Sequence, residues 1–132
     1  MKQQIKRIRK ASVAILATIF MIFSTTVISV NAATVTKTGT TSQGYRVSST
    51  ATFSNKTVTG NGRVVSGGPC SIQVSAKGYY LSHGVYVLSC SISDKVGSSQ
   101  SLTKKTSGSY TLKKAICSSK FNSETTVTAT SS

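Results

Sequence analysis

Residues 70–77 read CSIQVSAK, and apolar and polar side chains alternate through this stretch. Cys70, Ile72, Val74 and Ala76 share one parity, and polar or charged residues occupy the other. Successive side chains of a β-strand point to opposite faces of a sheet, so the alternation predicts a strand with one buried and one solvated face.

The same alternation recurs upstream and downstream. Its apolar positions are Tyr45, Val47, Ala51 and Phe53 in the upstream segment and Tyr86, Leu88, Cys90 and Ile92 in the downstream one. Turn-like segments separate these runs, and Asn61-Gly62 is a residue pair that a two-residue hairpin turn favours, because both central residues need φ > 0. About eight short strands fit a small antiparallel β-sandwich of immunoglobulin-like size, and a small β-barrel is the alternative.

The composition favours strands as well. Ser and Thr supply 37 of the 100 residues from 33 to 132, whereas Leu occurs four times and Glu once in the same span. Good helix formers are therefore scarce and β-branched residues abundant, so we expect an all-β domain.

The first 32 residues have the three parts of a secretory signal peptide. A basic start precedes the apolar run 13–23, and small residues at 30 and 32 precede the expected cleavage site after Ala32. Residues 27–30 extend the apolar segment, so an uncleaved anchor is the alternative, although the polar residues 24–26 interrupt it. We expect one secreted, extracellular domain of residues 33–132, and the style of the signal resembles that of Gram-positive bacteria.

The charge is strongly positive. The chain has 16 Lys and Arg against 2 Asp and Glu and one His, a formal net charge of +14. Eleven basic residues and both acidic ones lie in residues 33–132, which leaves +9. So few carboxylates and imidazoles cannot build most acid/base pairs of hydrolases, and His and Cys show no metal-ligand spacing. We expect no enzyme, no cofactor and no small-molecule substrate.

Three cysteines in a secreted chain allow one disulfide and one remaining thiol. A hairpin of 70–76 and 85–92 centred on Tyr80 would set Cys70 opposite Cys90, which is the pairing we favour. Bridges from Cys117 to either of the others are the alternatives. Unpaired, Cys117 is expected to be a buried thiol or to link two copies in a dimer.

Lysines form the strongest candidate binding feature. Two pairs, Lys104-Lys105 and Lys113-Lys114, lie symmetrically about residues 107–109, and Lys120 follows. A hairpin of residues 101–116 would bring like charges together at a cost that an anionic partner offsets. The alternative interpretation is that these lysines protect a sheet edge and maintain solubility.

A second candidate is the segment 78–84, GYYLSHG, whose side chains include Tyr79, Tyr80, Leu81 and His83. Exposed, it would form an aromatic tip that stacks on sugar rings or enters a membrane interface. Folded back, it would close the core at the end of a hairpin.

These features predict a non-enzymatic domain that binds an anionic cell-surface polymer, teichoic acid or an anionic lipid surface, through a lysine-rich face. Nucleic acid is expected to bind only nonspecifically, because no recognisable module interleaves aromatic and basic residues. A secreted antimicrobial antagonist of the bacteriocin type is the alternative, and an adhesive or structural surface protein is the third.

Overall fold

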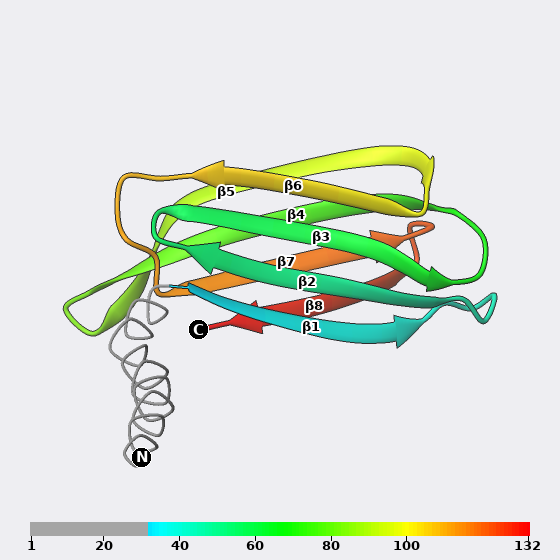
Figure 1. Ribbon diagram of the computed structural model, residues 1–132, viewed down its shortest axis with the longest axis horizontal. Coiled ribbons are helices and arrows are strands. Elements are labelled where there is room, and N and C mark those ends of the chain that lie inside the picture. The colour runs from blue at the N-terminus through cyan, green and yellow to red at the C-terminus, as the bar shows by residue number, and fades with distance from the viewer. Residues whose placement is uncertain (1–31) are drawn as a thin grey trace, which may run out of the picture. The chain divides into compact units, whose positions relative to one another are not determined.

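The computed structural model describes residues 32–132, all eight of whose regular elements are β-strands (Figure 1). The strands are β1 (Ala32–Thr40), β2 (Arg46–Ser54), β3 (Thr57–Ser66), β4 (Cys70–Ser82), β5 (Val85–Ser99), β6 (Ser101–Ser107), β7 (Lys114–Phe121) and β8 (Thr125–Ser131). The expected signal peptide, residues 1–32, lies outside the described residues except for Ala32, the first residue of β1.

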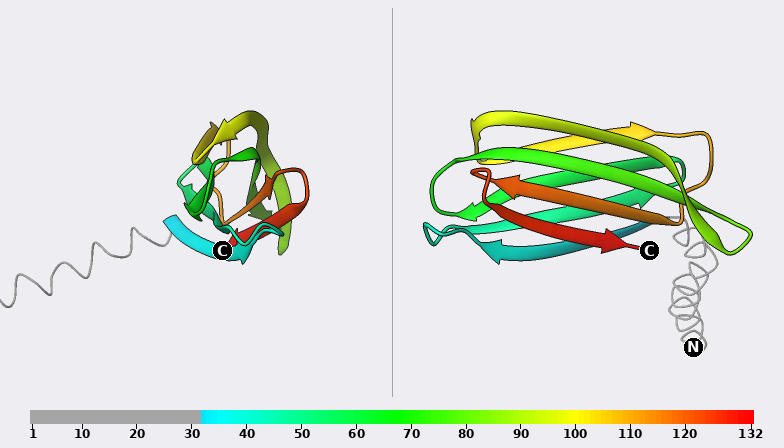
Figure 2. Two further views of the ribbon diagram at one scale, coloured as in Figure 1. Left: turned by 90° about the vertical axis from the view of Figure 1, so that its right-hand side faces the viewer. Right: turned by 180° about the vertical axis from the view of Figure 1, so that it is seen from behind.

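The strands form two four-stranded antiparallel sheets that face each other (Figure 2). The first sheet has the order β1-β2-β3-β6 and the second sheet the order β5-β4-β7-β8. This arrangement confirms the predicted all-β class and the small β-sandwich rather than the closed barrel. Residues 32–132 thus contain both layers and the core between them.

The core consists of the apolar parity of each inner strand. In β4, Cys70, Ile72, Val74 and Ala76 are all buried, as their alternation predicts. Val47, Ala51 and Phe53 of β2 face them from the first sheet, also as expected. Most of these side chains are small. Because burial stabilises a fold by about 25 cal/mol per Å² of apolar area, each of them contributes little to the stability of the sandwich.

Small and polar residues let the two sheets approach closely at the centre. A Cβ atom on Gly60 would lie 2.9 Å from both the Ala76 Cβ and the Cys117 Sγ, so only glycine fits there. Ser49 and Ser119 are fully buried, and their hydroxyl oxygens lie 2.8 Å apart. Ser49 also donates to the Cys117 carbonyl oxygen at 3.1 Å, which satisfies its polar atom inside the core.

The expected turn at Asn61-Gly62 is wrong. Both residues lie inside β3, and the turn between β2 and β3 is at Asn55-Lys56, with Asn55 at φ 56°. Asparagine tolerates this left-handed conformation, so the turn needs no glycine. Gly62 instead serves packing, because a Cβ there would lie 2.9 Å from the Ser119 Oγ.

The register expected for the β4–β5 hairpin is also wrong. The turn is at His83-Gly84, whose φ values are 50° and 81°, rather than at Tyr80. Two residues with positive φ form the tight turn that suits a hairpin, and they shift the pairing toward the C-terminus. Cys90 consequently pairs with Gly78, and Cys70 pairs with Ser99 at the far end of the hairpin.

This register separates the cysteines. Cys70 lies eight residues along β4 from the Cys90–Gly78 pair, or about 26 Å at the rise of a strand, whereas disulfides need Cα atoms within about 7 Å. Cys117 pairs with Ala76 in the middle of the sheet, about 12 Å or more from either partner. All three cysteines are free, and the expected Cys70–Cys90 bridge is not formed.

Candidate anion-binding face

Four lysines share the outer face of the second sheet, and we call Lys77, Lys95, Lys114 and Lys120 the lysine face. Lys77, Lys114 and Lys120 alternate with buried residues and therefore point away from the core, and Lys95 pairs with the outward Gln73 of β4. Lys95, Gln73 and Lys120 form one row across β5, β4 and β7. Lys77 lies further along β4, and Lys114 pairs with Tyr79 near the end of β7.

The spacing on this face suits several contacts to one extended anion. Lys95 and Lys120 are two strands apart, about 10 Å at the usual strand spacing. This is close to the screening length in physiological salt, about 8 Å, so the lysines repel each other weakly. Lys77, Lys95 and Lys120 are exposed, which leaves their ammonium groups accessible.

Neither carboxylate of the chain lies on the lysine face. Asp94 pairs with the buried Val74, so it occupies the inner parity of β5, and it forms an ion pair with Lys104 of β6. Glu124, in the turn between β7 and β8, accepts a hydrogen bond from Ser42 at 2.7 Å. The charged side chains on the outer face of the second sheet are consequently all lysines.

The pKa of Asp94 reflects its pairing. The hydrogen bond from Lys104 is the main cause that lowers the pKa of this carboxyl below its ordinary value. The Lys95 backbone N–H, 2.7 Å from Asp94 Oδ1, and the charge of Lys104 lower it further. Lys104 is thereby occupied by a carboxylate and is a weaker candidate for binding an external anion.

The predicted lysine hairpin is wrong. β6 pairs with β3 in the first sheet, whereas β7 pairs with β4 and β8 in the second sheet, so the chain crosses between layers after Ser107. The two pairs, Lys104-Lys105 and Lys113-Lys114, therefore lie in or beside different sheets. The physical reason is Leu112, which is fully buried in the core and anchors the crossing.

Of the five lysines predicted as a site, Lys114 and Lys120 lie on the lysine face. Lys105 pairs with Thr59 on the outer face of the first sheet, and the half-buried Lys113 donates its backbone N–H to the Tyr79 carbonyl at 2.8 Å. Lys77 and Lys95 were missed. The alternation of residues 70–77 already places Lys77 on the outer parity, but the position of Lys95 depends on the hairpin register.

The outer face of the first sheet is the natural comparison. It carries three exposed basic residues, Arg46, Arg63 and Lys105, among threonines and serines. Its hydroxyl groups pair across strands, for example Thr36 with Thr50 at 2.8 Å. This face is less basic than the lysine face and bears no apolar extension.

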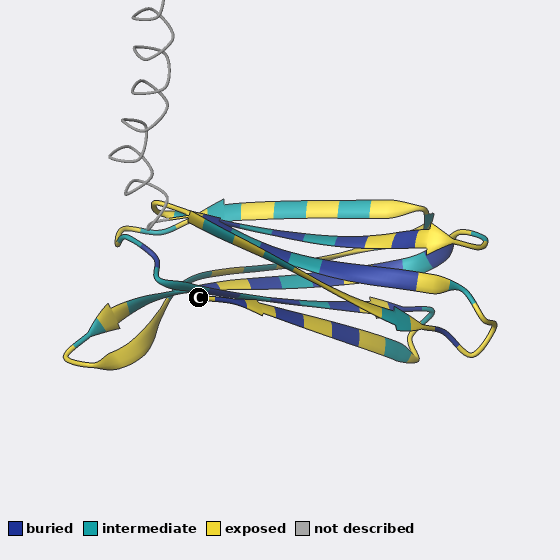
Figure 3. Ribbon diagram, turned by 60° about the horizontal axis from the view of Figure 1, so that its bottom comes forward, coloured by how far each residue is buried: buried dark blue, intermediate teal, exposed yellow. Residues whose placement is uncertain are grey.

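The aromatic tip is the end of the β4–β5 hairpin, which projects past the other strands (Figure 3). We call residues 79–88 the hairpin arm. The last pair between β4 and β7 joins Tyr79 to Lys114, and beyond it the arm continues with three β4–β5 pairs up to Ser82 and Val85. Of the four residues expected at the tip, Leu81 and His83 are exposed, whereas Tyr79 and Tyr80 are half-buried.

Aromatic contacts fix the base of the hairpin arm. Tyr80 stacks on Tyr110, from the connection between the sheets, with ring centroids 4.2 Å apart. On the other side, the Lys114 Nζ lies 4.7 Å from the Tyr86 ring centroid and 5.8 Å from that of Tyr79. These cation–π contacts hold a lysine of the lysine face directly against the apolar arm.

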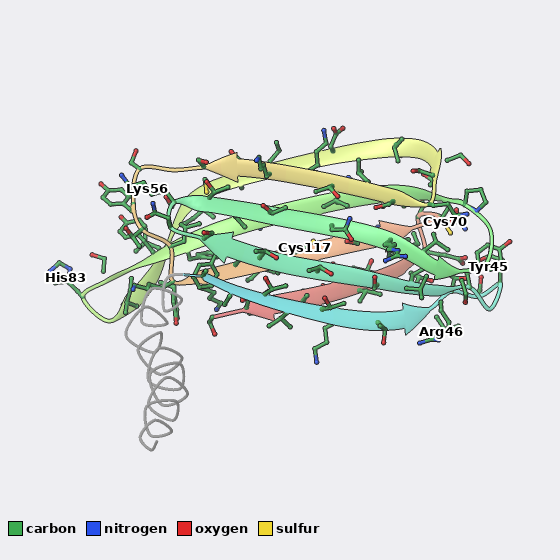
Figure 4. All side chains as sticks on the ribbon, viewed as in Figure 1. Tyr45, Arg46, Lys56, Cys70, His83 and Cys117 are labelled. Atoms are coloured by element: carbon green, nitrogen blue, oxygen red, sulfur yellow. The ribbon has the colours of Figure 1, made fainter. Side chains whose placement is uncertain are left out.

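His83 lies at the tip of the hairpin arm, distant from Cys70 and Cys117 (Figure 4). Its Nδ1 is 3.1 Å from the Ser82 Oγ.

Burial is the main cause that raises the pKa of both the Cys70 and the Cys90 thiols, which keeps them protonated and weakly nucleophilic at neutral pH. Cys117 is fully buried, so the fold exposes no sulfur there for a link between copies.

Within residues 32–132, no cluster of three or more His, Cys, Asp or Glu side chains is arranged to hold a metal ion. That part of the chain also contains no helix with the length and hydrophobicity to cross a membrane. No protein-family model, no curated protein and no solved structure matches the chain.

Proposed function

We propose that this protein is a secreted, non-enzymatic domain that binds an anionic component of a cell envelope through the lysine face. The observation that carries the proposal is the set of four outward lysines on the second sheet, with both carboxylates engaged elsewhere. A repeating phosphate polymer such as teichoic acid, or an array of anionic headgroups, offers charges at intervals that several lysines can contact together.

Binding of this kind is cumulative and sensitive to salt. Each lysine that neutralises a phosphate of a flexible polyanion releases counterions. The logarithm of the binding constant therefore falls with the logarithm of the salt concentration, with a slope of about 0.7 per contact. Four contacts predict a loss of about 50-fold between 50 and 200 mM salt. Nucleic acid is expected to bind through the same charges without base recognition.

Two variants with equal net charge test the proposal. One combines Lys77→Gln, Lys95→Gln and Lys120→Gln on the lysine face. The matched control combines Arg46→Gln, Arg63→Gln and Lys105→Gln on the first sheet, and all six side chains are exposed. At about 1 kcal/mol per lysine, the first variant should bind poly(glycerol phosphate) about 100-fold more weakly than the unmodified domain in titration calorimetry.

The control should lose far less affinity, since its substitutions change only the overall charge. Equal losses in the two variants would show that net charge alone attracts the polymer, and would refute the lysine face as the site. Unchanged affinity in the lysine-face variant would do the same.

The exposed hairpin arm favours one second candidate, a secreted antagonist of other bacteria. In this function the lysine face concentrates the protein on a target envelope, and the arm perturbs it. Growth inhibition of a panel of Gram-positive strains by the purified domain supports this candidate, and no inhibition across the panel argues against it.

A further inference from the structure

The hairpin arm carries most of the large apolar side chains that are exposed on the domain. Six of the seven large apolar side chains exposed within residues 32–132 belong to the arm or stack against it. They are Leu81, Val85, Tyr86, Val87, Leu88 and Tyr110. Single exposed apolar residues are common on soluble proteins, but a contiguous group marks an interaction surface.

One side of the hairpin arm continues the lysine face. Tyr79 pairs with Leu88, and Leu81 pairs with Tyr86, so these four side chains share the outward side of the second sheet. Lys114 lies at the junction, against the rings of Tyr79 and Tyr86. The outer surface of the second sheet therefore bears lysines over β4, β5 and β7 and apolar side chains on the arm that extends it.

This combination fits a bilayer interface better than a soluble polymer. Phosphate headgroups attract the lysines, and the boundary between headgroups and acyl chains accommodates tyrosine rings and leucines. A phosphate polymer in water would contact the lysines but leave the arm exposed. Charge complementarity and the continuity of the two surfaces thus point to one occupant.

We infer that the envelope component is a bilayer rich in anionic lipid, into which the hairpin arm inserts shallowly; this rests on the proposed function and specifies its partner. The arm extends three residue pairs past its last pairing with β7, about 10 Å. Amphipathic segments enter the headgroup boundary to a depth of about 5–10 Å.

The backbone limits the depth of insertion. Beyond Tyr79 neither edge of the two-stranded arm has a neighbouring strand in its sheet, so its outward N–H and C=O groups need water. Hydrocarbon cannot satisfy such groups, whereas the hydrated interface can. The polar Ser82-His83 tip likewise suits the headgroup region.

Sedimentation with vesicles tests the inference on the domain of residues 32–132. The vesicles contain phosphatidylcholine alone or with about 30% phosphatidylglycerol, a fraction chosen to give a strongly negative surface. The arm variant combines Leu81→Ser and Leu88→Ser, and Val65→Ser, an exposed apolar position on β3, is the matched control. We expect the arm variant to bind anionic vesicles at least tenfold more weakly and poly(glycerol phosphate) with unchanged affinity, and the control to behave as the unmodified domain.

A fluorescent reporter makes the test independent of affinity. The chain has no Trp, so Leu81→Trp introduces a single one on the arm, and Val65→Trp is its control. We expect the emission of Leu81→Trp to shift to the blue with anionic vesicles and that of Val65→Trp to stay unchanged.

The possible failures are distinguishable. If the domain binds the polymer but not the vesicles, or binds vesicles equally well without the arm leucines, the inference fails and the proposed function stands. If it binds neither, the proposed function fails as well. Dimerisation of the free domain that requires the arm, detected by analytical ultracentrifugation, would assign the arm to a second copy and overturn the inference.

Discussion

At the scale of single residues, both carboxylates connect the two sheets. Asp94 of β5 in the second sheet pairs with Lys104 of β6 in the first sheet. On the opposite side of the sandwich, Glu124 accepts a hydrogen bond from Ser42, which lies between β1 and β2. The two acidic residues therefore join the sheets at opposite edges of the sandwich. Their placement also leaves the lysine face free of negative charge.

The Asp94–Lys104 pair predicts a specific dependence of stability on acid. The folded state holds the pKa of Asp94 below its ordinary value of 3.8, so the pair stabilises the fold above that pH. The contribution is lost as the pH falls through the lower pKa of the folded state. We expect the difference in unfolding temperature between the unmodified domain and Asp94→Asn to shrink as the pH is lowered from 6 to 2.

Two further variants control for general charge effects. In the Lys104→Gln background, Asp94→Asn should no longer cause a pH-dependent difference in unfolding temperature, because the partner of Asp94 is already removed. In the Lys105→Gln background, that pH-dependent difference should remain, because Lys105 lies on the outer face beside Thr59. A constant difference between the unmodified domain and Asp94→Asn across the pH range would contradict the assignment.

At the scale of elements, the connection from β6 to β7 determines where the lysines lie. Residues 108–113 carry the chain from the first sheet to the second, and Leu112 is fully buried on the way. Gly78 makes room for it, since a Cβ there would come 2.7 Å from the Leu112 Cδ1. The Leu112 backbone N–H also donates to the Asn55 carbonyl at 2.7 Å, which anchors the connection to the β2–β3 turn.

Truncation of this anchor should be costly. Leu112→Ala leaves a cavity in the core, and we expect the free energy of unfolding to fall by about 3 kcal/mol in urea denaturation. Leu81→Ala on the exposed arm is the matched control, and it should change stability by less than about 0.5 kcal/mol. A loss below about 1 kcal/mol for Leu112→Ala would show that the connection is not held by the core.

At the scale of the whole molecule, local patterns predicted more than long-range pairing. The alternation around Val74 correctly identified the buried side of β4. The alternation of residues 86–92 did not hold in β5, because a register shift opposite Gly78 and Tyr79 leaves Tyr86 and Leu88 exposed while Cys90 and Ile92 pack against the core. The hairpin register was wrong because the turn lies at His83-Gly84, within one of several turn-like segments, and not at Tyr80. The strand that pairs with β6 depends on contacts distant in sequence. The positive charge of the domain could therefore be predicted, but not which lysines share one face of a sheet.

Non-covalent packing holds the two sheets together, because all three cysteines are free. An expected disulfide would supply about 2–4 kcal/mol, yet the register keeps the three sulfur atoms too far apart to bond. Stability then rests on the packing of two thin layers. We expect three thiols to react with a chromogenic disulfide reagent after unfolding without reductant, and to react slowly in the folded domain. The urea midpoint should be the same with and without dithiothreitol. A single reactive thiol, or a midpoint lowered by reductant, would show instead that a covalent bridge stabilises the sandwich.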